Sequence, residues 1–375
     1  MSFAVDDRRH MAHALQLARY GLYTTDPNPR VGCVLARDGA VVGTGWHERA
    51  GEPHAERHAL AAAGERARGA TAYVTLEPCA HTGRTGPCAD ALIEAGVARV
   101  VMAMEDPNPS GAGGARRLRQ AGVEVDSGLL EDEARALNPG FIRRMETGRP
   151  LVRLKLAASL DGRTAMASGE SQWITGSAAR DDVQRLRARS SAIVTGRGTA
   201  VMDRPSLTVR PEQWQYPDYP EGEVRRPLRV VLDRTLATPV DTPLMTAPGS
   251  VLLLCTGAAD EQRRSALEAS GGEIMTLAAD QDRVSLPGVL DELGRRACNE
   301  VLFECGAELA GDLMRHALVD EVMLYMAPIL LGSSARPLMA LPGIEHMSEQ
   351  LRLRLTDLRH LGDDLRLTLA PAPTD

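Results

Sequence analysis

The spacing of hydrophobic residues in the first 150 positions predicts alternating helices and strands. Apolar residues recur every three or four positions in some segments, as in amphipathic helices, and alternate or run continuously in others, as in strands. The predicted helices cover residues 6–20, 54–63, 87–95, 114–121 and 131–145. The predicted strands cover residues 31–35, 40–46, 70–76 and 97–102, and the first two form a hairpin around Asp38-Gly39. This alternation predicts an α/β sandwich.

The rest of the chain repeats the alternation and changes character at its end. Short apolar runs predict strands, separated by helices, over residues 152–156, 192–195, 228–232, 251–255 and 301–304. Residues 351–355 and 365–369 alternate apolar and polar positions around a turn at Gly362-Asp363, which predicts an antiparallel hairpin added to a mostly parallel sheet. Gly148 and Pro150 mark a short linker. We therefore predict two α/β domains, residues 1–146 and residues 150–375.

Composition and charge exclude several classes of protein. Of the 375 residues, 43% are hydrophobic and 25% are charged, which is ordinary for a globular protein. No apolar run approaches the roughly 18 residues that span a bilayer, and residues 1–10 do not resemble a secretory signal, so we predict a cytoplasmic protein. A net charge of −7 and 3% aromatic residues argue against nucleic-acid binding, and we expect neither a nucleic acid nor a membrane as partner.

Two short motifs carry residue types that bind zinc. Residues 53–56 read Pro-His-Ala-Glu, and residues 77–88 read Glu-Pro-Cys-Ala-His-Thr-Gly-Arg-Thr-Gly-Pro-Cys. A catalytic zinc site uses three nitrogen, sulfur or oxygen ligands from the protein and leaves a fourth position for water. His54, Cys79 and Cys88 supply such a set, and the predicted helix start at Cys88 favours the thiolate form that binds metal.

Glu56 is the predicted proton shuttle of this site. A His-x-Glu sequence followed by Pro-Cys is the signature of zinc nucleobase deaminases, in which the Glu is the acid and base and not a ligand. Residues two apart do not share a helix face, so the helix end must direct both His54 and Glu56 at the metal. The alternatives are a four-ligand structural zinc or buried cysteines. His58 and Cys33 are rival ligands, although we expect Cys33 to pack inside a strand.

The eight residues between the two cysteines depart from the two-residue spacing of the generic deaminase signature. This insertion holds His81, Arg84 and Thr85, which can all donate hydrogen bonds to phosphate. Its glycines, Gly83 and Gly86, let the backbone approach a ligand closely. We interpret the insertion as a clamp for phosphate or ribose. The alternative is a solvated surface loop.

The motifs together resemble the bifunctional deaminase–reductases of riboflavin biosynthesis. The resemblance rests on Pro27-Asn-Pro-Arg-Val-Gly32, Gly51-Glu-Pro-His-Ala-Glu56 and residues 75–88, and continues in the second region with residues 155–166, 169–175 and 205–210. It differs at Ala80, where serine is usual, and at Gly86, where proline is usual. It implies a cytidine-deaminase-like α/β sandwich with one Zn²⁺, followed by a domain like dihydrofolate reductase that uses NADPH.

The resemblance also implies two consecutive reactions on one phosphorylated pyrimidine. The first domain would remove the 2-amino group of 2,5-diamino-6-ribosylamino-4(3H)-pyrimidinone 5′-phosphate by hydrolysis, with Glu56 relaying protons. In the family, Asn28 and His47 would hold this substrate, and His81 with Arg84 would face its phosphate. The second domain would then reduce the ribosyl group to ribityl with NADPH.

The second region lacks a Gly-x-Gly-x-x-Gly after a strand, which argues against a Rossmann domain. Its strand ending at Glu304 precedes a glycine turn and a helix start, which is a ready anion site. Thr195-Gly-Arg-Gly-Thr199 is a second glycine-rich turn after a strand. By resemblance, the cofactor would be bound by Ala157, Trp173, Thr199, Asp203, Gly306, Ala307, Glu308, Leu309, Ala310 and Gly311. By the same resemblance, the reductase substrate would contact Ser171, Arg187, Leu207, Arg210 and Glu304.

Two other functions compete with this interpretation. One is a deaminase of nucleic acid or free nucleosides with an appended domain, against which the acidic charge and the long insertion argue. The other is a non-enzymatic binding module with a structural zinc. The resemblance further implies a homo-oligomer, a dimer or larger.

Overall fold

A computed structural model describes residues 3–81, 86–210 and 225–372 of the chain. Its internal contacts divide the described residues into two compact units, one ending at Gly148 and the other beginning at Arg149. Arg84 lies outside the described residues. Among the described helices, none is long and apolar enough to cross a membrane.

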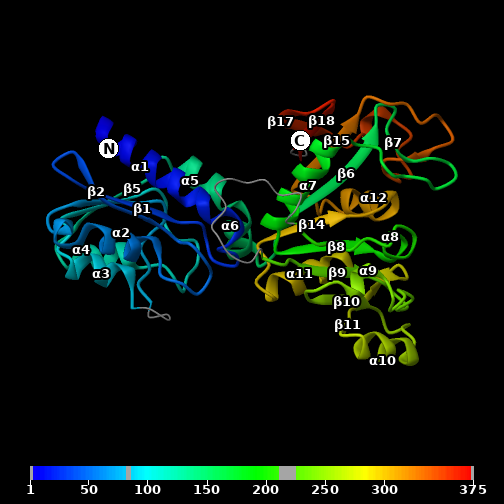
Figure 1. The fold of residues 1–375 in the computed structure, drawn as a ribbon, viewed down its shortest axis with the longest axis horizontal. Coiled ribbons are helices and arrows are strands. Elements are labelled where there is room, and N and C mark those ends of the chain that lie inside the picture. The colour runs from blue at the N-terminus through cyan, green and yellow to red at the C-terminus, as the bar shows by residue number, and fades with distance from the viewer. Residues whose placement is uncertain (1–2, 82–85, 211–224, 373–375) are drawn as a thin grey trace. The chain divides into compact units, whose positions relative to one another are not determined.

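In the first unit, helices cover both faces of a sheet that has five strands among the described residues (Figure 1). Its strands are β1 (Gly32–Arg37), β2 (Ala40–Trp46), β3 (Thr71–Val74), β4 (Arg99–Met102) and β5 (Glu124–Ser127), in the spatial order β2-β1-β3-β4-β5. Its helices are α1 (Val5–Ala18), α2 (Ala55–Ala63), α3 (Cys88–Glu94), α4 (Gly114–Gln120), α5 (Glu131–Leu137) and α6 (Pro139–Thr147), and its 3-10 turns are η1 (Arg19–Tyr23) and η2 (Gly64–Ala67). The predicted α/β sandwich is confirmed.

Two apolar layers hold this unit together. Side chains of α1, α5 and α6 pack with β1, β3 and β4 on one face of the sheet. On the other face, α2, α3 and α4 pack against the same sheet through alanines and leucines. β1 is buried on both sides because it lies inside this sandwich. The strands β3 and β4 run parallel, so their carboxyl ends meet at one edge, where the chain continues into residues 75–79 and 103–108.

One predicted helix of this unit is wrong. The sequence pattern gave a single helix over residues 131–145, whereas the structure has α5 and α6, broken at Asn138. Pro139 explains the break, because proline has no N–H to donate and disfavours the helical conformation of the residue before it. Pro139 instead takes the first position of α6, where its missing N–H costs nothing.

The second unit is built on a sheet with nine strands among the described residues. In spatial order these are β11 (Glu273–Thr276), β10 (Val251–Cys255), β9 (Leu228–Leu232), β8 (Ala192–Gly196), β14 (Glu300–Glu304), β6 (Leu151–Ser159), β15 (Glu321–Ala327), β18 (Asp364–Pro371) and β17 (Leu353–Leu361). The strands from β11 to β15 in this order run parallel. β18 runs antiparallel to both β15 and β17, so β17 and β18 form the predicted terminal hairpin, which is confirmed. Small pairs are formed by β7 (Arg163–Ala165) with β16 (Arg336–Pro337) and by β12 (Ala279–Asp280) with β13 (Arg283–Val284).

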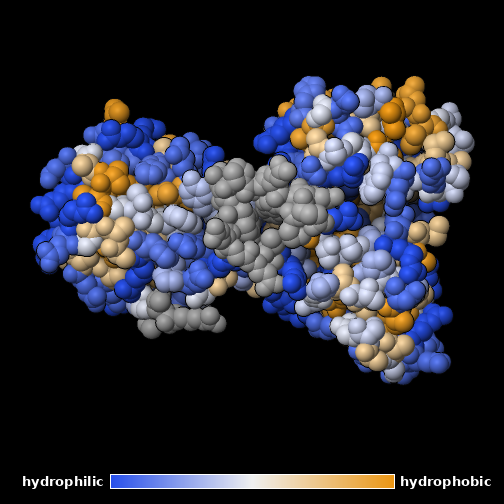
Figure 2. Space-filling view, in the orientation of Figure 1, coloured by the Kyte–Doolittle hydropathy of each residue, from blue (hydrophilic) through white to orange (hydrophobic). Residues whose placement is uncertain are grey.

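Helices pack on both faces of this sheet. Those of the second unit are α7 (Ser177–Arg189), α8 (Arg197–Met202), α9 (Pro243–Thr246), α10 (Glu261–Ala269), α11 (Leu286–Arg295) and α12 (Ala307–Arg315), with the 3-10 turn η4 (Met347–Glu349). Side chains of α11 and α12 belong to the largest apolar cluster of this unit. Side chains of α10 and of α7 belong to two other apolar clusters, each of which also includes side chains from the strands. Figure 2 shows hydrophobic residues gathered near the top of this unit, where Figure 1 places β7.

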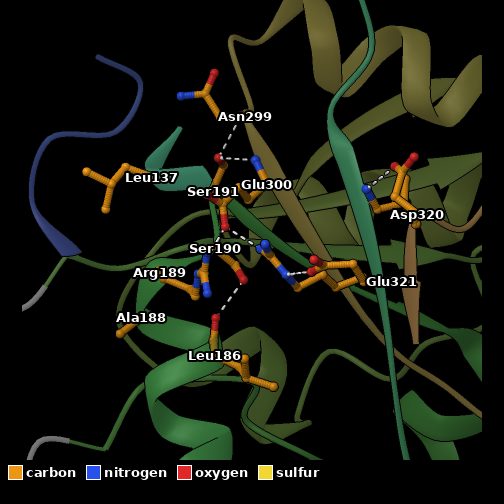
Figure 3. Close-up of polar contacts among 12 residues, drawn as sticks. Leu137, Leu186, Ala188, Arg189, Ser190, Ser191, Asn299, Glu300, Asp320 and Glu321 are labelled. Atoms are coloured by element: carbon orange, nitrogen blue, oxygen red, sulfur yellow. Dashed lines mark hydrogen bonds and ion pairs between the residues drawn. The ribbon is translucent and has the colours of Figure 1, made fainter. Parts of the chain in front are cut away.

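A polar network ties together the amino ends of the central strands (Figure 3). The Ser191 hydroxyl accepts the backbone N–H groups of Asn299 at 2.8 Å and Glu300 at 3.1 Å. The buried carboxylate of Glu300 accepts hydrogen bonds from Arg189, at 3.1 Å, and from Arg153. Because these contacts join strands at their amino ends, the opposite, carboxyl edge of the sheet is left for a binding site, as is usual in parallel sheets.

Candidate functional sites

The structure brings His54, Cys79 and Cys88 together at the carboxyl edge of the first sheet. Their ligand atoms all lie within 4.8 Å of one another. The His54 Nδ1 atom lies 3.6 Å from Cys79 Sγ and 3.3 Å from Cys88 Sγ. One imidazole and two sulfurs at this spacing fit a zinc ion. Within the described part of the chain, this group has three members, and it includes neither His58 nor Cys33, which is fully buried in β1.

The local backbone explains how His54 and Glu56 face the same point. His54 is the N-cap of α2 and has extended backbone angles, φ −77° and ψ 165°, so helical periodicity does not relate it to Glu56. The Glu56 side chain hydrogen-bonds Cys88, and only 3% of the residue is exposed. Burial raises the pKa of this carboxyl. His54 and Glu56 thus both contact Cys88, as the predicted arrangement requires.

The two cysteines also contact each other. The backbone N–H of Cys88 donates to Cys79 Sγ at 3.3 Å, and the Cys88 side chain donates a further hydrogen bond to the same sulfur. These hydrogen bonds lower the pKa of Cys79, so the pair offers a thiolate to a cation.

A cavity of about 530 Å³ adjoins the triad. Asn28, His47 and His81 line it together with His54, Glu56 and Cys79. His47 Nδ1 lies 3.1 Å from the Pro53 carbonyl oxygen, which can only accept, so the ring carries its proton there. Asn28 Nδ2 then donates to Nε2 at 3.1 Å. Burial lowers the pKa of His47 to about 4, so this ring stays neutral at physiological pH.

A larger cavity of about 1300 Å³ opens at the carboxyl edge of the second sheet. It brings together most of the cofactor and substrate residues that the resemblance implied: Ala157, Ser171, Trp173, Arg187, Thr199, Asp203, Leu207, Arg210, Glu304, Gly306, Ala307, Glu308 and Leu309. Gly306 caps the amino end of α12. Ala310 and Gly311 do not line the cavity. Gly311 packs so tightly that a Cβ atom there would lie 1.9 Å from the Ala340 carbonyl oxygen.

An ion pair whose two side chains are each 11% exposed lines this cavity. Arg187 donates from Nε to Glu304 Oε1 at 2.6 Å and from Nη2 to Oε2 at 2.9 Å. Burial would raise the pKa of Glu304, but the positive charges of Arg187, Lys155 and Arg210 together outweigh it and lower the pKa. Lys155, the only lysine of the chain, lines the same cavity from β6. Burial lowers its pKa, and the Glu304 carboxylate opposes this effect.

Two patterns that define protein families match this chain. The pattern of the RibD C-terminal domain matches residues 150–367. The cytidine and deoxycytidylate deaminase zinc-binding region matches residues 4–104. The riboflavin biosynthesis protein RibD of Escherichia coli is 50% identical over 376 residues, which cover 98% of this chain and 100% of that protein. This chain belongs to the RibD family.

Solved RibD structures share the whole fold. The RibD of Acinetobacter baumannii superposes with a TM-score of 0.90 at 46% identity and covers 98% of this chain and 99% of its own. A second structure, from Thermotoga maritima, superposes with a TM-score of 0.84 at 31% identity and has the same coverage. It is described as a diaminohydroxyphosphoribosylaminopyrimidine deaminase/5-amino-6-(5-phosphoribosylamino)uracil reductase. The family resemblance inferred from the motifs is confirmed.

The RibD sequence motifs do not reveal every residue that shapes the smaller cavity. Glu77 lines it, and its carboxylate accepts the backbone N–H groups of Asp106, Gly113 and Ala115 at 3.2, 3.0 and 2.9 Å. Arg57 holds the end of the insertion by donating to the Gly86 carbonyl oxygen at 2.9 Å. Glu77 stands in the Glu-Pro-Cys motif, but its three partners lie 29 to 38 residues further along the chain, so no local sequence pattern indicates these contacts.

Proposed function

We propose that this chain catalyses two consecutive steps of riboflavin biosynthesis. The first step is deamination of 2,5-diamino-6-ribosylamino-4(3H)-pyrimidinone 5′-phosphate. The second is reduction of the ribosyl group, which gives 5-amino-6-ribitylamino-uracil 5′-phosphate. We assign the first to residues 1–146 and the second to residues 150–375. The observation that carries the proposal is the close triad of His54, Cys79 and Cys88 beside a buried glutamate in a cavity.

In the deaminase site, His54, Cys79 and Cys88 would hold one Zn²⁺, which supplies a water molecule of lowered pKa. Glu56 would take a proton from that water and deliver it to the departing amino group, because its buried carboxyl contacts the metal ligand Cys88. The neutral His47 ring fixes the Asn28 amide by accepting from its Nδ2. Asn28 and His47 would then hold the pyrimidine, and His81 with Arg84 would face its phosphate.

In the reductase cavity, the backbone at Gly306–Leu309 would receive the cofactor pyrophosphate at the amino end of α12, supported from behind by the tightly packed Ala310 and Gly311. Ala157, Trp173, Thr199 and Asp203 would line the cofactor, which supplies a hydride. Ser171, Arg187, Leu207, Arg210 and Glu304 would position the substrate. The two hydrogen bonds between Arg187 and Glu304 hold these side chains in one geometry.

NADPH fits the cavity better than NADH because of the residues that follow β8 and β9. These strands end side by side, with Gly196 opposite Leu232, and Arg197 and Arg234 after them line the cavity. An acidic group facing the ribose would repel the 2′-phosphate of NADPH. Asp233 is fully buried, and its carboxylate accepts from the Thr238 N–H and hydroxyl, both at 2.7 Å. It therefore turns away from the cavity. Arg197 and Arg234 remain in the lining, Arg234 paired with Asp282 of the same cavity wall.

Replacing both arginines should abolish the preference for NADPH. In Arg197→Ala/Arg234→Ala, the Kd of NADPH should rise about 10- to 100-fold, the cost of charge-assisted hydrogen bonds to phosphate, while that of NADH stays the same. Fluorescence titration of the bound dinucleotide measures both. Arg263→Ala, an exposed arginine outside the cavity, is the matched control. Equal weakening of NADPH and NADH would contradict this role.

We also propose a homo-oligomer, a dimer or larger. β17 is the outer strand of the nine-stranded order, so one of its edges has no neighbour in the described residues. Leu353, Leu355 and Leu358 on this strand are 36%, 51% and 51% exposed. Long apolar edge strands of this kind usually pair or are covered.

A direct assay of the full chain tests the proposed function. We expect one zinc per chain, ammonia release from the diaminopyrimidine phosphate, and NADPH oxidation only after that release. Cytidine and a transfer RNA should release no ammonia. Turnover of either of these without the diaminopyrimidine phosphate would favour a nucleoside or nucleic-acid deaminase. Zinc binding without any turnover would favour a structural module.

A further inference from the structure

One face of α6 forms part of the wall of the deaminase cavity. Phe141, Arg144 and Met145 all line the cavity, and their spacing of three and four residues places them on the same side of the helix. Phe141 is buried in the apolar layer that also contains Leu76, and Met145 packs against this layer. The helix therefore contributes two apolar side chains and one arginine to the cavity wall.

Hydrogen bonds join the start of α6 to the loop at residues 27–31, which also lines the cavity. The Asn138 side chain, just before α6, donates to the Arg30 carbonyl oxygen at 2.9 Å and accepts the Arg30 N–H at 2.8 Å. Arg30 also donates to the Leu137 carbonyl oxygen at 2.5 Å. Residues 27–29 and Val31 line the cavity. These three hydrogen bonds hold α6 in register with the loop that carries Asn28, so Arg144 has a defined place in the wall.

Arg144 lies in a cavity whose other charged lining residues are mostly acidic. Its described lining includes four carboxylic acids, Glu52, Glu56, Glu77 and Asp106. Arg144 is the one lysine or arginine among those described lining residues. The amino groups of the proposed diaminopyrimidine substrate can donate hydrogen bonds to these acidic side chains. The acidic side chains would repel the phosphate dianion of the same substrate unless a cation stood beside it. Guanidinium is the side-chain group best matched to phosphate.

We propose that Arg144 binds the 5′-phosphate of the deaminase substrate, so that α6 helps to select phosphorylated pyrimidines. This inference rests on the proposed deaminase function. It makes Arg144 a residue for substrate affinity and specificity, without a part in proton transfer. Phe141 and Met145, beside it on the helix, would contact apolar parts of the same ligand.

Steady-state deamination by the full, zinc-loaded chain tests this proposal. In Arg144→Ala we expect the KM for the diaminopyrimidine phosphate to rise about 10- to 100-fold, with kcat within about 3-fold of the parent. The dephosphorylated nucleoside should be a poor substrate for the parent and equally poor for the variant. Arg144→Lys should recover part of the affinity because it restores the charge. Arg143→Ala, the exposed neighbour outside the cavity, should match the parent.

The outcomes separate this inference from its premise. The reductase activity of the same polypeptide and its zinc content report whether Arg144→Ala folds. A variant that keeps both and has the parent KM overturns the inference, as does a variant that weakens the phosphorylated and dephosphorylated compounds equally. A parent chain that releases no ammonia from the diaminopyrimidine phosphate overturns the proposed function instead. As a second measurement, calorimetric binding of that compound to Glu56→Gln should weaken by the same factor when Arg144→Ala is added.

Discussion

Glu56→Gln should lower ammonia release about 10²–10⁴-fold, the usual contribution of a positioned acid and base. Glutamine keeps the size and the hydrogen-bonding capacity of the side chain but cannot carry a proton between water and the leaving amine. Glu56 is 3% exposed and hydrogen-bonds Cys88, so bulk water has little access to replace it. We therefore expect kcat to fall while the KM changes little, measured by coupled detection of ammonia.

Two controls make this result specific. Zinc content, measured by elemental analysis, should stay at one per chain because Glu56 is not among the three proposed ligands. Glu52→Gln changes another acid that lines the same cavity but is exposed, and it should retain near-parental deamination. Parental ammonia release by Glu56→Gln would refute its role, and loss of zinc would mean that Glu56 holds the metal.

Arg187→Met should destabilise the second unit by about 3 kcal/mol, because it leaves the Glu304 carboxylate, which is only 11% exposed, without its main partner. We take the lower end of the usual range because Lys155 still attracts that carboxylate. For a unit of this size the loss corresponds to a fall in Tm of about 6–12 °C, measured by calorimetry. Reduction should be lost as well, whereas ammonia release should persist.

A second variant distinguishes stability from function at the same pair. Arg187→Met/Glu304→Gln leaves neither of the two charges behind, so most of the lost Tm should return. NADPH oxidation should remain absent, because neither the guanidinium nor the carboxylate is there to position the substrate. Recovery of NADPH oxidation in the double variant would contradict the role that we assign to the pair. An unchanged Tm in Arg187→Met would contradict its contribution to stability.

Local sequence patterns predicted most of the fold and missed elements whose pattern is ambiguous. The strand β15 was missed because its run Glu-Val-Met-Leu-Tyr-Met-Ala lacks regular alternation and fits a buried helix equally well. β5 was missed because this edge strand buries few side chains and its sequence is mostly polar. The terminal hairpin was predicted because edge strands with one solvated face keep a period of two.

The cluster of His54, Cys79 and Cys88 could be predicted because these residues lie in two short motifs whose residue types bind metals. The orientation of Glu56 could not, since it depends on the extended backbone of His54 at the helix N-cap. The place of α6 in the cavity wall could not either. It is set by hydrogen bonds between Asn138 and Arg30, which are 108 residues apart, and by a helix break at Pro139.

The position of the only lysine gives a simple probe of the second sheet. Lys155 lies in β6, which pairs with β14 on one side and β15 on the other. A protease that cuts only after lysine can therefore cleave this chain at one peptide bond, and only when the middle of the sheet opens. The rate at which fragments 1–155 and 156–375 appear would measure that opening, and bound dinucleotide should slow it.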